Sequence, residues 1–132
     1  MSVDKNKAVV REFVSKVLVS RDLSMIDKLL APNYVNHLGN VDLAGFKAML
    51  STLKSAITKQ EIEIEDMVGE GDSVVIRGKI HITFADGKKT DGRIITYYRL
   101  ENGKIGEDDP ISIPDLGQIL SNIAPPKETQ QG

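Results

Sequence analysis

Residues 73–111 hold the feature that most restricts the fold: two tight turns between three runs of alternating apolar and polar residues. Asn102-Gly103 separates the second run from the third. This dipeptide favours a type I′ turn, because both central residues of that turn need φ > 0. A two-residue turn fixes which residues of the two strands face each other. The predicted pairs on one side of the sheet are Leu100 with Ile105, Tyr98 with Glu107, Thr96 with Asp109 and Ile94 with Ile111.

The first two runs need a longer loop. A two-residue turn at residues 86–87 would place Ile80 opposite Arg93 and mix the apolar and polar faces. We therefore predict a three-residue loop, Asp86-Gly87-Lys88, which keeps each hydrophobic set on one face. The predicted pairs are then Ile76 with Tyr98, Ile80 with Ile94 and Phe84 with Thr90.

The two registers together place Gly78, Thr96 and Asp109 in a row across three strands on the apolar face. Gly78 has no side chain, Thr96 has a short one, and Asp109 is a carboxylate. An ionised group on a core-facing surface costs free energy unless something compensates it. The row therefore predicts a depression with a polar floor, which is the best candidate for a ligand pocket.

The composition predicts one globular domain, which we assign to residues 1–124, because 132 residues with 40% hydrophobic side chains can build a core. A net charge of −2 with interspersed signs predicts no nucleic-acid surface and no membrane-binding stripe. The absence of cysteine excludes disulfides, zinc–thiolate sites and cysteine nucleophiles. We see no signal peptide or membrane span and expect a cytoplasmic protein. We expect residues 125–132 to be a disordered tail.

Three helices precede the sheet in the prediction, because apolar residues recur at helical spacing in residues 4–20, between Ser24 and Pro32, and in residues 42–57. Asp42 is the expected N-cap of the third helix. The strand that starts at residue 73 would extend about 43 Å at about 3.3 Å per residue, so it must bend, and Gly78 is the natural bend. We therefore predict a cone-shaped α+β fold, with the helices on the concave face of a strongly bent mixed or antiparallel sheet.

The convex face of this sheet needs a cover of its own. Residues 91–100 are apolar on both sides, with Ile95 and Tyr97 on the side that faces away from the helices. No helix remains to cover that side. We therefore predict a homodimer packed through the convex face.

Histidines and apolar helix residues supply further candidates. His37 lies near Tyr34, and it either bonds to backbone at a chain turn or lines the pocket. Phe46 and Met49 share one side of the third helix, where they either fill the core or wall the pocket. The parity of the strand puts His81 on the convex face, unless a bulge at Gly78 turns it inward. With two histidines and no ligand spacing, we predict no metal site.

Several ordered blocks resemble a known family. LAPNYVNH (30–37), EGDSVVIRG (70–78), YYRLENGKIGED (97–108) and DLGQIL (115–120) are similar to the SnoaL-like polyketide cyclase family of the NTF2-like superfamily. The resemblance implies a cone-shaped α+β barrel, a deep apolar pocket for a small molecule and frequent homodimers. It also implies ring closure by aldol condensation without metal or cofactor.

The same resemblance implies a general base on the last strand. It maps onto Asp109, with Asp108 as the alternative if the register slips. The histidine that family cyclases carry on the preceding strand has no counterpart, since Ile94, Thr96 and Tyr98 stand there.

Physical chemistry gives Asp109 two reasons for a raised pKa, namely its apolar cleft and the like charge of Glu107. Such a base would take a proton next to a carbonyl, and Tyr98 would donate to the enolate oxygen, with His37 in support. Alternatively, both acids reach solvent and pair with a Lys or Arg. The leading hypothesis is cofactor-free cyclase or isomerase chemistry on an apolar carbonyl compound. The second is a non-catalytic ligand-binding or dimeric interaction module.

Overall fold

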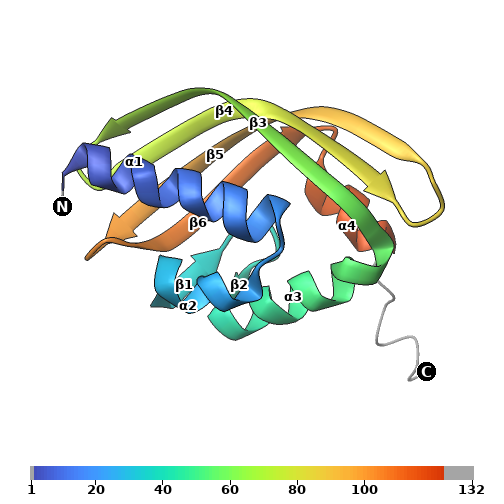
Figure 1. Cartoon of the computed structure of the whole chain (residues 1–132), viewed down its shortest axis with the longest axis horizontal. Helices are drawn as coiled ribbons and strands as arrows, with labels where there is room; N and C mark the ends of the chain where they lie inside the picture. Colours follow the sequence, from blue (N-terminus) through green and yellow to red (C-terminus); the bar gives the residue numbers. More distant parts are fainter. Residues whose placement is uncertain (1, 124–132) are drawn as a thin grey trace.

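A six-stranded sheet arches over the helices of the chain, and the computed structural model describes residues 2–123 of this arrangement (Figure 1). The strand order is β2-β1-β6-β5-β4-β3. All neighbouring pairs are antiparallel except β1 and β6, which run parallel. The strands are β1 (Leu30–Asn36), β2 (Val41–Asp42), β3 (Ile57–Glu70), β4 (Ser73–Phe84), β5 (Lys89–Glu101) and β6 (Lys104–Ile113). The prediction of an α+β cone with a bent mixed sheet is confirmed.

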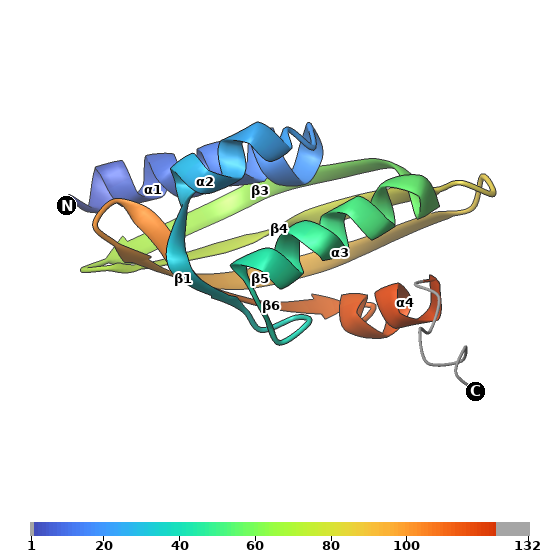
Figure 2. The ribbon, with the colours of Figure 1, turned by 90° about the horizontal axis from the view of Figure 1, so that it is seen from below.

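Helices fill the hollow of the arch. Figure 2 shows α1 and α3 on the hollow side of the sheet, with α4 beyond the end of β6. Asp42 caps α3 as predicted, because its Oδ1 accepts a hydrogen bond from the Gly45 N–H at 2.9 Å. The helical segments are α1 (Val3–Glu12), the π-helix η1 (Phe13–Val19) that continues it, the 3₁₀ helix η2 (Leu23–Met25), α2 (Ile26–Leu29), α3 (Leu43–Ala56) and α4 (Leu116–Ile123).

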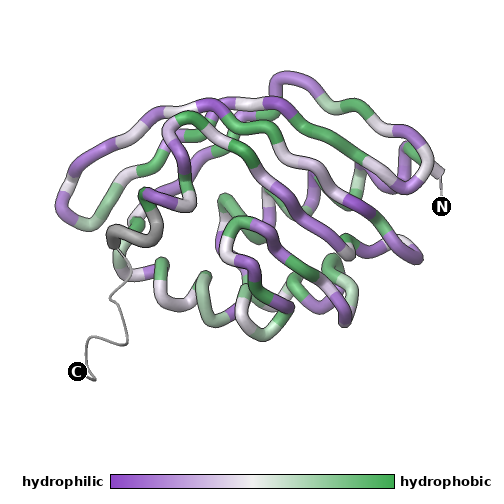
Figure 3. The backbone as a smooth tube through the Cα atoms, turned by 180° about the vertical axis from the view of Figure 1, so that it is seen from behind, coloured by the Kyte–Doolittle hydropathy of each residue, from purple (hydrophilic) through white to green (hydrophobic). Residues whose placement is uncertain are grey.

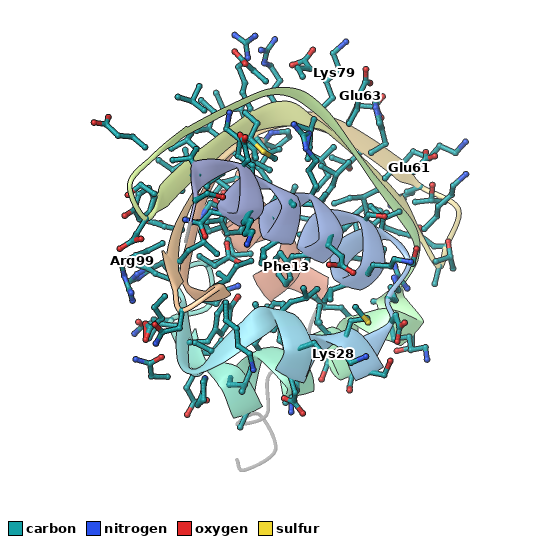
Figure 4. The ribbon with its side chains drawn as sticks, turned by 60° about the vertical axis from the view of Figure 1, so that its left-hand side comes forward. Phe13, Lys28, Glu61, Glu63, Lys79 and Arg99 are labelled. Atoms are coloured by element: carbon teal, nitrogen blue, oxygen red, sulfur yellow. The ribbon has the colours of Figure 1, made fainter. Side chains whose placement is uncertain are left out.

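The core lies between the helices and the concave side of the sheet. Phe13 is fully buried, and its ring lies 6.0 Å from that of Tyr98 on β5 and 6.1 Å from that of Phe46 on α3. Figure 4 shows Phe13 pointing inward, whereas Glu63 and Lys79 project from the opposite side of the sheet. The backbone alternates between hydrophilic and hydrophobic residues along the strands (Figure 3), as expected of a sheet with one solvated face.

The β5–β6 hairpin begins in the predicted register and then departs from it. Leu100 pairs with Ile105, as predicted from the Asn102-Gly103 turn, in which both residues have φ > 0. The register then shifts, because Gly106 is an extra residue on β6, and the next pair is Arg99 with Glu107. The observed pairs beyond this bulge are Tyr98 with Asp108, Tyr97 with Asp109, Thr96 with Pro110 and Ile95 with Ile111. The predicted pairs Tyr98–Glu107, Thr96–Asp109 and Ile94–Ile111 are therefore wrong.

The β4–β5 hairpin has a three-residue loop, but it is Ala85–Gly87 rather than Asp86–Lys88. The N–H of Phe84 donates to the carbonyl of Lys88 at 2.8 Å, and Gly87 takes the positive φ of +90°. The loop is one residue earlier than predicted, so every pair moves by two residues and the faces stay the same. The observed pairs are Ile76 with Thr96, Gly78 with Ile94, Ile80 with Gly92 and Ile82 with Thr90.

No helix within residues 2–123 is long and apolar enough to cross a membrane. The predicted disordered tail, residues 125–132, lies outside the described residues. The convex side of the sheet carries exposed apolar side chains at Ile95, Ile111 and Ile113.

Candidate functional site

Asp108 is a buried carboxylate on the concave side of β6. Its exposed fraction is 4%, whereas the neighbouring Asp109 points outward and is exposed. The Gly106 bulge is the cause, because one extra residue reverses which side chains of a strand face inward. The prediction that Asp109 faces the pocket is wrong, and the alternative that we left open, Asp108, lies there instead.

A chain of hydrogen bonds holds this carboxylate. The hydroxyl of Tyr34 donates to Oδ2 of Asp108 at 2.9 Å, and Nδ2 of Asn36 donates to the Tyr34 oxygen at 2.9 Å. A longer bond, 3.4 Å, joins Nδ2 of Asn36 to the same Oδ2. The backbone N–H groups of Leu38 and Gly39 donate to Oδ1 of Asn36 at 2.8 and 3.4 Å, which fixes the amide orientation.

The second carboxylate oxygen, Oδ1 of Asp108, accepts no hydrogen bond from any residue in the range 2–123. Asp108 also lines the interior cavity described below. One oxygen is therefore committed to the protein, and the other is left for a ligand.

Burial raises the pKa of Asp108 from 3.8 to about 7, because desolvation penalises the ionised form. The hydrogen bond from Tyr34 opposes this rise, the charge of Asp109 adds to it, and His37 opposes it. Burial, and then the charge of Asp108, raises the pKa of Tyr34 and of Tyr98 well above the usual value. Both phenols are therefore protonated donors wherever Asp108 can titrate.

The cavity beside Asp108 has an empty volume of about 630 Å³, counting the space at its open mouth. Its polar lining residues are Asn36, Gln60, Thr96, Tyr98 and Asp108. The remaining wall is apolar and comes from α3, the sheet and α4, including Phe46, Met49, Leu53, Ile80, Ile94 and Leu116. The predicted substrate-binding residues Thr96, Tyr98, Phe46 and Met49 thus lie in the wall. Tyr34 does not line the cavity, and its link to it is the hydrogen bond to Asp108. No Lys or Arg of the described chain lines this cavity.

The model of the SnoaL-like polyketide cyclase family matches residues 8–120 of this sequence. The chain belongs to the SnoaL-like polyketide cyclase family. A search among curated protein sequences found no match to it.

The chain is also similar in fold to several solved structures. A proposed polyketide cyclase from Acidithiobacillus ferrooxidans superposes with a TM-score of 0.74 at 24% identity, over 94% of this chain and 100% of its own. AclR, a proposed hydroxylase from Streptomyces galilaeus, superposes with a TM-score of 0.74 at 21% identity, over 98% of this chain and 90% of its own. IdmH, a proposed polyketide cyclase from Streptomyces antibioticus, superposes with a TM-score of 0.73 at 18% identity, over 89% of this chain and 99% of its own. At these identities the likeness shows a shared fold.

Two predicted site residues of this SnoaL-like protein lie outside the cavity. Nε2 of His37 lies 2.7 Å from Oε2 of Glu107, and Nε of Arg99 donates to Oε1 of Glu107 at 3.2 Å. The hydrogen bond with His37, followed by that from Arg99, lowers the pKa of Glu107. Glu107 faces away from the pocket for the same reason as Asp109, and the placement of Glu107 and His37 beside a ligand is wrong. Figure 4 shows Arg99 at the outer side of the sheet.

Gly78 does not line the cavity either. A Cβ at this position would lie 2.4 Å from the carbonyl oxygen of Glu63 on β3, so the space beside Gly78 is filled by backbone. The predicted depression above Gly78 is wrong, whereas the role of this glycine as a point of close approach fits. His81 faces the convex side, where Nδ1 lies 2.7 Å from Oδ1 of Asp91.

Asn36 is the site residue that the sequence interpretation did not single out. Tyr34 and Asn36 alternate with exposed neighbours on β1, so the period of two placed both on one face. The second overlooked signal was Gly106, since an isolated glycine within a strand pattern is typical of a bulge. Within residues 2–123, no three His, Asp or Glu side chains are grouped closely enough to hold a metal ion.

Proposed function

We propose that this SnoaL-like protein performs cofactor-free acid–base chemistry of the cyclase or isomerase type on an apolar carbonyl compound. The observation that carries the proposal is a buried carboxylate, Asp108, with a pKa of about 7 and one uncommitted oxygen at the polar end of an apolar cavity. A general base works best when its pKa lies near the working pH. Asp108 meets that condition, and burial is the reason.

In the proposed reaction, Asp108 takes a proton from the carbon next to the carbonyl group. The C–H electron pair becomes the C=C bond of an enolate, and the carbonyl π electrons move to its oxygen. In a cyclase, the enolate carbon then attacks a second carbonyl of the same molecule, and the new alkoxide recovers the proton from Asp108. In an isomerase, the proton returns to a different carbon.

Donors for the enolate oxygen come from β5. Tyr98 is paired with Asp108 across the two strands, and Thr96 lies on the same face two residues away. Both carry hydroxyl groups, and the raised pKa of Tyr98 keeps its phenol protonated. Donors that are already oriented in a site shielded from water stabilise developing charge more than they would in solution.

The test compares Asp108→Asn with its neighbour Asp109→Asn. Exchange of the α-protons of 1-tetralone, a neutral aryl ketone, is followed by NMR in D₂O while the Asp108 carboxyl is titrated by ¹³C NMR. We expect titration near pH 7 and exchange that Asp108→Asn abolishes and Asp109→Asn retains. An Asp108 that titrates near pH 4, or equal exchange in both variants, would overturn the proposal.

A non-catalytic ligand-binding module is the second candidate. It is favoured by the absence of the histidine that family cyclases carry beside the base, since Ile94 and Thr96 occupy that strand. In this case an apolar ligand would bind in the cavity, Asp108→Asn would weaken its binding, and the parent protein would exchange no protons. Mass spectrometry of ligands that co-purify with the native protein would identify the occupant.

The homodimer also stays a proposal. Its support is the group of Ile95, Ile111 and Ile113 on the convex face, whose exposed fractions are 50%, 71% and 77%. We expect light scattering to find a dimer that Ile111→Lys converts to a monomer. Val68→Lys is the control, because Val68 is also exposed but lies outside this group. A monomeric parent protein would rule the dimer out.

Independence from cofactors and a cytoplasmic location are proposals of the same kind. The first is supported by Asp108, because a carboxyl with a pKa of about 7 supplies a base without help from a metal. Exchange that survives EDTA and dialysis would agree with it, and loss of exchange would contradict it. Cell fractionation tests the location.

A further inference from the structure

A second cavity shares part of its lining with the pocket, whereas Asp108 lines the pocket alone. We call it the outer groove, and it lies between η1, the C-terminal half of α3 and the start of β3, with an empty volume of about 430 Å³ counting its open side. Its apolar lining includes Val17, Leu23 and Ile57. Its two charged lining residues, Arg21 and Lys54, are both cations.

The outer groove and the pocket share four lining residues. Leu18, Leu50, Leu53 and Gln60 line both cavities. Nε2 of Gln60 donates to the carbonyl of Leu18 at 3.2 Å, so one hydrogen bond between a strand and the π-helix spans the partition. A π-helical segment at such a place is typical of functional sites. An elongated ligand can therefore occupy both spaces once these side chains move.

The two cations of the outer groove have no acidic partner in the described part of the chain. Neither forms an ion pair there, and no Asp or Glu lines the groove. The adjacent Asp22 directs its carboxylate to the N–H and hydroxyl of Ser24. A guanidinium N–H of Arg21 donates to the Ile57 carbonyl, and this hydrogen bond holds the Arg21 side chain at the groove. The backbone of Arg21 has a positive φ of +59°.

We infer that the outer groove binds the anionic end of an elongated apolar ligand, a carboxylate or sulfonate, while the body of the ligand lies in the pocket. Apolar walls with two unpaired cations at the rim match an amphipathic anion. Asp108 lines the pocket but not the outer groove, and its carboxylate repels an anion once it is ionised. Charge therefore orients such a ligand, with its neutral end at Asp108 and its anionic end at Arg21 and Lys54.

The two cations also lie at the C-terminus of α3, where positive charge complements the helix dipole. That role would affect stability and would give no preference for a charged ligand over a neutral one. The test therefore compares two fluorescent dyes with the same aromatic body. One is 8-anilino-1-naphthalenesulfonate, which is anionic, and the other is N-phenyl-1-naphthylamine, which is neutral.

We expect Arg21→Gln combined with Lys54→Gln to weaken binding of the sulfonate dye roughly tenfold and to leave the neutral dye within about twofold. Lys59→Gln is the matched control, because Lys59 is exposed, pairs with Glu61 and lies outside the groove. Arg21→Lys keeps the charge and should keep the preference. High salt should reduce the preference of the parent protein for the sulfonate dye.

Equal changes for both dyes, or no change in either, would overturn the inference. A lower melting temperature in the double variant with unchanged dye selectivity would assign the two cations to the helix terminus alone, which also overturns it. Because the readout is dye binding, the result stands whether or not the pocket catalyses proton transfer.

Discussion

The hydroxyl of Tyr34 on β1 donates to Oδ2 of Asp108 on β6 across 74 residues of sequence. Asn36 donates to the same hydroxyl oxygen, so the phenolic proton is directed at the carboxylate. The bond lies where β1 and β6 run parallel. The acidity of Asp108 therefore depends on a contact between β1 and β6, the first and last strands along the chain.

Tyr34→Phe should raise the pKa of Asp108 further. The lost hydrogen bond stabilises the ionised carboxylate and opposes the effect of burial. The measurement is the ¹³C titration of Asp108, with Tyr97→Phe as the control because Tyr97 bonds to Ser73 away from the site. A midpoint that stays in place or moves to lower pH would contradict the assigned hydrogen bond.

Stability should fall as the pH rises from about 4 to about 7, and Asp108→Asn should remove that fall. In this window the folded protein keeps a proton on Asp108 that the unfolded chain has released, because the folded pKa is raised to about 7. Above pH 7 the folded state holds a buried charge at a cost on the order of a few kcal/mol. Urea unfolding at pH 4.5 and pH 8 measures the difference.

For that prediction, Asp109→Asn is the comparison, because Asp109 is exposed. We expect the advantage of Asp108→Asn over the parent protein to be larger at pH 8 than at pH 4.5. An advantage of equal size at the two pH values would mean that Asp108 titrates normally.

Deletion of Gly106 should leave Asp108 facing the cavity. Gly106 is the extra residue of the bulge, so its removal restores regular alternation with Ile105 inward, Glu107 outward and Asp108 inward. We expect the deletion variant to keep an Asp108 pKa near 7 by NMR. A normal aspartate titration in a folded deletion variant would show that the bulge has another role.

Gly78→Ala should destabilise the fold by roughly 1–3 kcal/mol, because the added Cβ would meet the Glu63 backbone at 2.4 Å and a strand must shift. Gly39→Ala is the matched control, since its nearest contact is at 3.5 Å, to the sulfur of Met49. Denaturant unfolding measures both variants. Equal stability of the two would contradict the close approach of β3 and β4.

The alternation of side chains was enough to predict the three-stranded block, the inward faces of β4 and β5 and the type of the Asn102-Gly103 turn. It was not enough to predict the registers, because a bulge changes the count by one residue at a place that local pattern does not mark strongly. Gly106 gave only a weak signal, and the error passed to Glu107 and Asp109 together. The loop between β4 and β5 lies one residue earlier than predicted, so each β4–β5 pair moved by two residues. The side chains kept their faces, but Gly78 now lies opposite Ile94 instead of Thr96.

The hydrogen-bond chain through Asn36 could not be predicted for a different reason. It needs the parallel pairing of β1 with β6, which joins residues far apart in sequence. No short-range signal reports such a contact. The placement of Phe46 and Met49 in the cavity wall was open for another reason, because core residues and pocket residues share one helical pattern.

Asp108 and its polar partners come from β1, β5 and β6, whereas much of the apolar cavity wall comes from α3 and α4. Reactivity and shape thus reside on separate pieces of the backbone. A library that randomises Met49, Leu53 and Leu116 should change which ligands the cavity binds and leave the pKa of Asp108 unchanged. Because of this division, substitutions in α3 and α4 can change the ligand while the carboxylate and its hydrogen bonds stay the same.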